Sequence, residues 1–203
     1  MRRILNNNTY KGIFLGEYDK NSQGYYLEIL EKIEAIYRQM IESHSQVFVI
    51  TFQINFPDGS NAGYQGNNEL IRRLTDALKV DCKRKGFDPG YIWVREMSSY
   101  GNVHYHLTIL LNGNLIQNGY GLVRKANTLW RSYFPDDCDG GNVHLRDHSE
   151  YDVRSGGVKI RRNDPNFDQV YAESFRSASY LAKVFSKGDA PTKVNEFGCS
   201  RLR

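Results

Sequence analysis

The chain has 203 residues, a formal net charge of +4 and 40% hydrophobic residues. This length suits one domain with a proper core, and no apolar run approaches the length of a membrane span. The slightly basic charge permits nucleic-acid binding without requiring it. Three widely spaced cysteines, Cys82, Cys138 and Cys199, form no CxxC pair, which argues against a disulfide framework and against a thiolate zinc site.

The N-terminal region is rich in Asn, Gly and Tyr, and we expect an irregular lead-in over residues 1–24. Its first residues lack the apolar core of a signal peptide, so together with the cysteine usage the sequence predicts a cytoplasmic protein. Apolar residues at helical spacing predict a helix over residues 25–43. We therefore divide the chain into an N-terminal extension and helix packed on the core, residues 1–44, and a main domain, residues 45–203.

The main domain begins with a β-branched and aromatic run over residues 47–56, which predicts a strand ended by Pro57-Asp58-Gly59. Asn67 or Asn68 is a suitable cap for a helix that continues to Lys85. Two further strands, residues 91–97 and 103–111, are separated by a short polar turn. This spacing predicts an antiparallel hairpin.

The C-terminal half alternates between helices and shorter strands. We predict a helix over residues 122–133, strands over residues 142–147 and 157–161, and a final helix over residues 167–187. Strands joined by hairpins, with helices packed on them, indicate an α+β domain. We expect a central, mainly antiparallel sheet of about five strands flanked by helices.

Two histidines in the second hairpin strand, His104 and His106, are separated by one residue and so share one face of the strand. Glu96 shares a strand face with Ile92 and Val94, and the hairpin would bring its carboxylate beside the two imidazoles. Such a set suits a catalytic divalent cation with open positions, Mg²⁺ or Mn²⁺, although late transition metals fit as well. The alternative is a pair of imidazoles packed without a metal. We expect His144 and His148 to be surface or groove residues.

The predicted last helix places four residues on one side: Arg176, Tyr180, Lys183 and Lys187. Lys183, one turn after Tyr180, would stabilise both a phenolate and a phosphate oxygen. Arg176 and Lys187 are candidate contacts for a nucleic-acid backbone. The alternative is a solvated helix face with an incidental tyrosine. Tyr171, without a lysine at the same offset, is the competing nucleophile on this helix.

Taken together, these motifs resemble those of the HUH endonucleases. The resemblance rests on residues 47–57, on Glu96 with His104-Tyr105-His106, and on Tyr180-Leu181-Ala182-Lys183. The tyrosine follows the histidines, as in the replication-initiator (Rep) branch and unlike the relaxases. The resemblance implies an HUH, Rep-type endonuclease domain over residues 45–203 with a ferredoxin-like (RRM-like) core.

The chain is similar, more closely still, to the YagK/YfjJ-type domain of inovirus (filamentous phage) replication proteins. Besides the metal and tyrosine motifs, this similarity rests on residues 91–96 and on the closing segment Phe197-Gly198-Cys199-Ser200-Arg201. It covers residues 47–201 and includes Tyr105 at the centre of the histidine motif.

These resemblances imply an enzyme that nicks and joins single-stranded DNA at a specific site. Glu96, His104 and His106 would hold Mg²⁺ or Mn²⁺, and Tyr180, assisted by Lys183, would form a 5′-phosphotyrosine intermediate that initiates rolling-circle replication of a phage or mobile element in a bacterial host cell. The implied partners are single-stranded DNA or an origin hairpin and a host polymerase. A host helicase is also implied, because the sequence contains no GxxxxGK[ST] motif.

Further contacts with the DNA backbone are expected from three basic residues in and directly after the strand predicted over residues 157–161: Lys159, Arg161 and Arg162. A solvated hairpin is the alternative for this strand. Three other functions also stay open. They are a single-tyrosine HUH transposase, a non-catalytic DNA-binding regulator with the same fold, and a structural metalloprotein.

Overall fold

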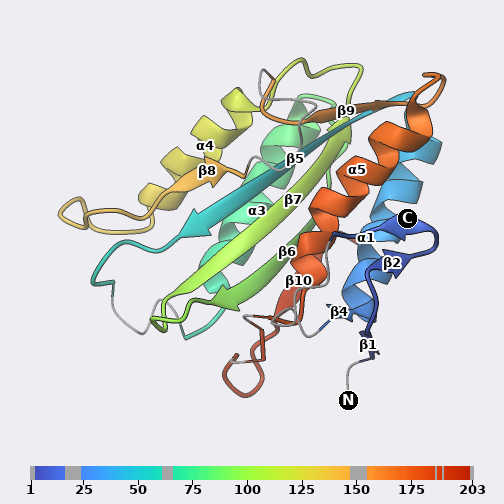
Figure 1. The fold of residues 1–203 in the computed structure, drawn as a ribbon. Coiled ribbons are helices and arrows are strands. Elements are labelled where there is room, and N and C mark those ends of the chain that lie inside the picture. Colours follow the sequence, from blue (N-terminus) through green and yellow to red (C-terminus); the bar gives the residue numbers. More distant parts are fainter. Residues whose placement is uncertain are drawn as a thin grey trace.

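A six-stranded antiparallel sheet forms the centre of the computed structural model, which describes residues 3–16, 24–60, 66–146, 155–185, 187–188 and 190–201 (Figure 1). The strand order is β10–β6–β7–β5–β8, and β9 also pairs with β5. These strands are β5 (Gln46–Asn55), β6 (Gly90–Met97), β7 (Val103–Asn112), β8 (Val143–Leu145), β9 (Val158–Arg161) and β10 (Phe197–Cys199).

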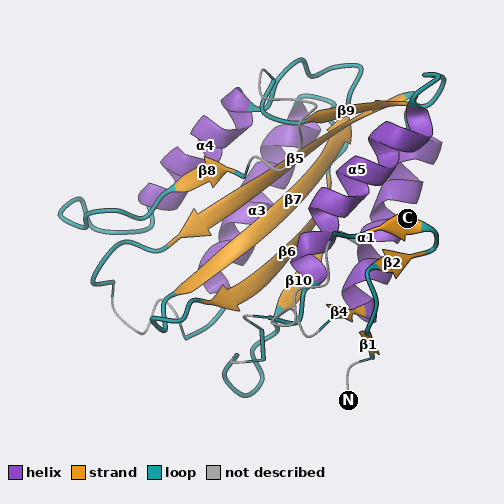
Figure 2. Cartoon of the chain, in the orientation of Figure 1, coloured by secondary structure: helices purple, strands orange, loops and turns teal. Residues whose placement is uncertain are grey.

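Helices cover both faces of the sheet (Figure 2). Within the described ranges they are α1 (Leu27–Ser43), α3 (Glu69–Arg84), α4 (Tyr120–Arg131) and α5 (Phe167–Ser179), followed by the short 3₁₀ helix η1 (Tyr180–Ala182). Four two-residue strands lie near the N-terminus: β1 (Ile4–Leu5), β2 (Thr9–Tyr10), β3 (Ile13–Phe14) and β4 (Tyr25–Tyr26). No described helix has the length and apolar character needed to cross a bilayer.

Alternation along the strands produces two apolar cores, one on each face of the sheet. On β5, Phe48 and Phe52 pack with the core of α3 and α4, whereas Val47 and Val49 pack with the core of α1 and α5. A strand covered on both faces is apolar at nearly every position, and this explains the continuous run in β5. The α+β class with a mainly antiparallel sheet is therefore confirmed.

The sixth strand, β10, was not predicted, because three residues carry too little alternation. It pairs with β6 at the edge of the sheet, with Gly198 opposite Trp93. A second difference concerns the final helix, which was predicted to reach residue 187 but ends at Ser179.

Backbone pairing with the N-terminal region accounts for this early end. Lys183 is extended and forms an antiparallel bridge with Tyr25, and the Val184 N–H donates to the Gly24 carbonyl at 3.0 Å. The chain after α5 is thus held by β4, and it leaves helical geometry to make these contacts.

Two glycines offer a matched test of packing in this fold. A Cβ added to Gly198 would lie 2.6 Å from the ring of the buried Trp93, whereas one added to Gly121 in α4 meets nothing within 4 Å. We expect Gly198→Ala to lower the free energy of unfolding by about 1–3 kcal/mol through overpacking. Gly121→Ala should raise it by about 0.4–1 kcal/mol. Urea unfolding measures both, and a Gly198→Ala protein as stable as the parent would contradict this packing.

Candidate metal centre and nucleophile

The hairpin of β6 and β7 builds the candidate metal centre. Its register pairs Glu96 with His104, and Val94 with His106, so that the three polar side chains emerge on the face covered by α1 and α5. Oε2 of Glu96 lies 3.4 Å from Nε2 of His104 and 3.3 Å from Nε2 of His106. One ligand atom from each residue lies within 4.8 Å of the others. The structure therefore brings together the three residues that the sequence predicted.

Two of the three candidate metal ligands are removed from water, with Glu96 4% and His106 2% exposed, whereas the His104 side chain is 18% exposed. Burial by itself would raise the pKa of Glu96, but hydrogen bonds with His104 and His106 and the charge of Lys187 hold that pKa well below its usual range. Burial lowers the pKa of His106 to about 4, although Glu96 acts in the opposite direction. The site thus holds an ionised carboxylate and a neutral His106, the forms that bind metal.

Lys187 completes the charge balance of the site. Its Nζ lies 2.6 Å from Oε1 of Glu96 and donates to the Lys183 carbonyl at 2.7 Å. The Lys187 side chain has no exposed surface, and burial lowers its pKa against the pull of Glu96. The expectation that Lys187 contacts a DNA backbone is therefore corrected, because its amine is buried against a candidate metal ligand.

Tyr180 lies beside the candidate metal ligands, as the resemblance implies, but in the 3₁₀ helix η1 and not within α5. Its ring centroid is 5.7 Å from that of His106, and Nζ of Lys183 is 4.8 Å from the Tyr180 ring centroid. Tyr171 lies elsewhere, packed against Tyr37 and Phe175 in the apolar core. The geometry favours Tyr180 over Tyr171 as the nucleophile.

Arg146 is a site residue that the sequence motifs did not identify. Its Cζ lies 3.5 Å from the ring centroid of Tyr180, and its Nη1 lies 3.1 Å from Nδ1 of His106. The residue follows β8, and its backbone N–H donates to the Thr51 carbonyl of β5. Its only sequence cue was its place in a predicted strand, and the pairing of that strand with β5 was unknown.

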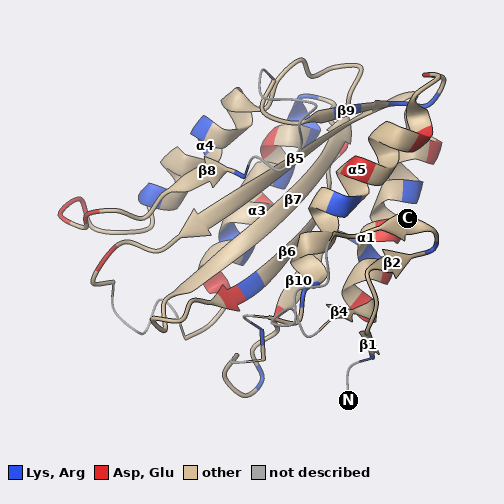
Figure 3. Cartoon of the chain, in the orientation of Figure 1, with Lys and Arg blue, Asp and Glu red and all other residues tan. Residues whose placement is uncertain are grey.

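The other predicted DNA contacts are dispersed. Arg176 is exposed one turn before Tyr180, but Lys159, Arg161 and Arg162 lie near the opposite end of the sheet, where Arg161 of β9 pairs with Gln46 of β5. His106 pairs with position 53 of β5, seven residues further along the strand, so Arg161 and His106 are roughly 23 Å apart along β5. The amine of Lys159 donates to the Ile116 carbonyl and a guanidinium N–H of Arg162 to the Ile41 carbonyl. The structure does not bring these three residues to the metal centre, and Figure 3 shows their charges along β9.

The remaining polar candidates lie outside the ligand cluster. Tyr105 points to the opposite face, as expected, where its hydroxyl accepts a hydrogen bond from Arg95 at 3.2 Å. His144 is exposed and hydrogen-bonds with Asn142. His148 lies outside the described residues.

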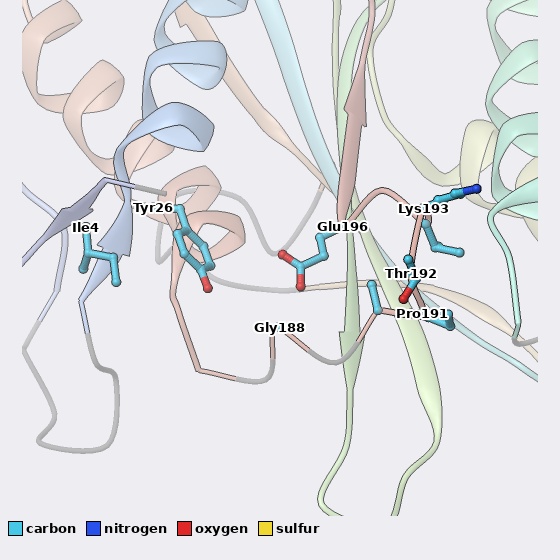
Figure 4. A pocket seen from close by; sticks show the side chains of 9 residues that line it. Ile4, Tyr26, Gly188, Pro191, Thr192, Lys193 and Glu196 are labelled. Carbon is cyan, nitrogen blue, oxygen red and sulfur yellow. The ribbon is translucent and has the colours of Figure 1, made fainter. Parts of the chain in front are cut away.

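An open pocket of 460 Å³ lies between the N-terminal strands and the loop that leads to β10. Figure 4 shows Tyr26 and Glu196 on opposite sides of this pocket. A much smaller cavity next to it is lined by Glu96, Lys187 and Glu196. The loop before β10 thus shields the buried side of Glu96.

Metal binding can be measured directly by titrating Mn²⁺ into the protein in a calorimeter. We expect one site per chain, and we expect Glu96→Gln or His106→Ala to weaken binding at least about tenfold, because each removes a ligand. His144→Ala is the matched control, since it removes a nearby imidazole that lies outside the cluster. Equal loss in the control, or unchanged binding in both ligand variants, would contradict the assigned ligand set.

The buried ion pair allows a second test. Lys187→Met leaves the Glu96 carboxylate without its cationic partner, so the metal-free variant should lose about 3–5 kcal/mol of stability. Added Mn²⁺ replaces the missing positive charge, and saturating metal should therefore stabilise this variant more than the parent. Denaturant unfolding with and without Mn²⁺ compares them. Equal metal stabilisation of the two proteins would show that Lys187 and the metal do not share Glu96.

Comparisons with known proteins agree on one family. The family model of the YagK/YfjJ C-terminal domain matches residues 9–200. The uncharacterized protein YfjJ of Escherichia coli K12 is 30% identical over 156 residues, covering 64% of this chain and 70% of YfjJ. The uncharacterized protein YagK of the same organism is 25% identical over 209 aligned residues, covering 87% of this chain and 93% of YagK. No solved structure matches the chain.

Proposed function

The chain belongs to the YagK/YfjJ C-terminal domain family, and we propose that it is a Rep-like HUH endonuclease that nicks and joins single-stranded DNA through Tyr180. The observation that carries this proposal is the position of the Tyr180 ring, 5.7 Å from that of His106 and in contact with Arg146. A phenol next to a candidate metal centre and two cations is suited to attack on a phosphodiester.

The residues of the centre fit a divalent cation. Two imidazoles and one carboxylate converge from two paired strands, with ligand atoms within 4.8 Å of one another, and this donor set suits Mg²⁺ or Mn²⁺ as well as later transition metals. Glu96, His104 and His106 would hold the ion. When bound, it would polarise the phosphoryl group and screen its negative charge.

The proposed reaction is a transesterification that needs no further reagent. The Tyr180 hydroxyl loses its proton, its oxygen bonds to phosphorus, and the bond from phosphorus to the 3′ oxygen breaks. That oxygen takes up a proton and leaves as a 3′-OH, and the 5′-phosphate stays on Tyr180. Arg146 and Lys183, whose cationic groups lie over the Tyr180 ring, would stabilise the negative charge on the phosphate oxygens.

The products fit the initiation of rolling-circle replication. The free 3′-OH can prime synthesis by a host polymerase, and a later attack by a DNA 3′-OH on the phosphotyrosine ester rejoins the strand. The substrate would be single-stranded DNA or an origin hairpin of a phage or mobile element in the bacterial cytoplasm, opened by a host helicase. A single-tyrosine transposase would use the same chemistry on a different DNA.

Covalent trapping tests this function. The protein is incubated with labelled single-stranded DNA from its own genetic element and with Mn²⁺, and the products are separated under denaturing conditions. We expect an adduct that requires the metal, disappears in Tyr180→Phe and persists in Tyr171→Phe, the matched control on α5. Arg146→Ala should slow adduct formation about 10- to 1,000-fold by removing one cation from the developing charge.

An adduct that persists in Tyr180→Phe would reject this nucleophile. Specific DNA binding without an adduct on any such strand would instead favour a non-catalytic regulator.

A further inference from the structure

A polar groove opens beside the metal ligand His104. It encloses 510 Å³ and is lined in part by the amides of Gln53, Asn55 and Asn142. In the pairing of β5 with β7, Asn55 lies opposite His104 and Gln53 opposite His106. These amides therefore share the sheet face that carries the metal ligands, and a strand bound at the metal would continue over them.

The groove is poor in charge. Strands β5, β7 and β8 contain no Lys, Arg, Asp or Glu, and Figure 3 draws their ribbons in tan. Among the groove's described lining residues the charged side chain is Asp58, and none is Lys or Arg. Lys and Arg supply most of the affinity for the charged phosphate backbone, so a groove that offers a carboxylate and no Lys or Arg is suited to the neutral bases of a nucleic acid.

Hydrogen bonds hold the amides in a chain. Nε2 of Gln53 donates to Oδ1 of Asn55 at 3.2 Å, and Nδ2 of Asn55 donates to Oδ1 of Asn142 at 3.2 Å. Nδ1 of His144 lies 3.1 Å from the same Asn142 oxygen. These hydrogen bonds orient the amides. Each amide has two N–H donors, and the contacts described for these residues leave further donors for a ligand.

We propose that this groove binds nucleobases of the DNA strand next to the phosphate at the metal centre, and that Asn55 and Asn142 read their hydrogen-bonding edges. This inference rests on the proposed function. Amide side chains make paired hydrogen bonds with base edges, above all with adenine. Unstacked bases of a single strand expose these edges. The groove also falls within the range of about 300–1,000 Å³ typical of small-ligand sites.

The test is a selection from single-stranded DNA with 20 random positions, using Tyr180→Phe protein with Mn²⁺ so that complexes are not converted to adducts. We expect an enriched motif containing adenine. Adding Asn55→Ala or Asn142→Ala should reduce the preference at one or two adjacent positions roughly tenfold while leaving the remaining positions and Mn²⁺ binding unchanged. Asn114→Ala, an exposed amide at the other end of β7, is the matched control and should leave the motif intact.

Loss of a backbone contact would weaken all sequences alike, whereas loss of a base contact changes the motif. An unchanged motif in both groove variants, a uniform loss of affinity, or failure of the parent to enrich any motif would each overturn the groove assignment. Adduct formation is measured separately on the protein that keeps Tyr180. If the groove variants shift the motif but no adduct forms, the nuclease proposal fails and the groove assignment stands. If adducts form but the motif does not shift, the groove assignment fails and the nuclease proposal stands.

Discussion

The register of the β6–β7 hairpin is the constraint on which the candidate site depends. A slip of one residue would turn Glu96 away from the imidazoles and place it in the opposite core. Two features fix the register. The turn is closed by backbone hydrogen bonds between Ser98 and both Gly101 and Asn102, with Gly101 in the left-handed region. Aromatic residues also occupy the other face, where Trp93 and Tyr105 pack edge to face. Packing on one face of the hairpin thus helps to fix the positions of Glu96, His104 and His106 on the other face.

The site is also a balance of buried charge. Glu96 receives hydrogen bonds or positive charge from two segments of the chain, the histidines of β7 and Lys187 after η1. A carboxylate buried without such partners would be protonated instead of ionised. The hydrogen bonds with His104 and His106, together with the ion pair with Lys187, therefore keep Glu96 ionised in the absence of metal. A divalent cation would bind a carboxylate that is already charged and oriented, and it would share that carboxylate with Lys187.

The parts of the fold and site that could be predicted from sequence are those set by local patterns. The spacing of His104 and His106 and the short turn after Glu96 place three candidate ligands within a single hairpin, and the long helices and strands follow from their periodicity. Contacts between distant segments could not be predicted in this way. Arg146 reaches Tyr180 only because β8 pairs with β5, and β10 is too short to show a pattern. The sequence also keeps a helical periodicity beyond Tyr180, but the backbone of Lys183 and Val184 pairs with residues more than 150 positions earlier.

This last pairing gives the N-terminal region a part in the site. Tyr25 is fully buried, and its bridge with Lys183 fixes the backbone three residues after Tyr180. The neighbouring Gly24 accepts the Val184 N–H and has a positive φ of 92°, and a Cβ there would lie 2.6 Å from the Leu5 carbonyl oxygen. Only glycine fits that turn without strain. Because η1 has three residues, Tyr180 lies between the end of α5 on one side and the pairing with β4 on the other. Residues far from the metal ligands in sequence thus decide where the proposed nucleophile stands.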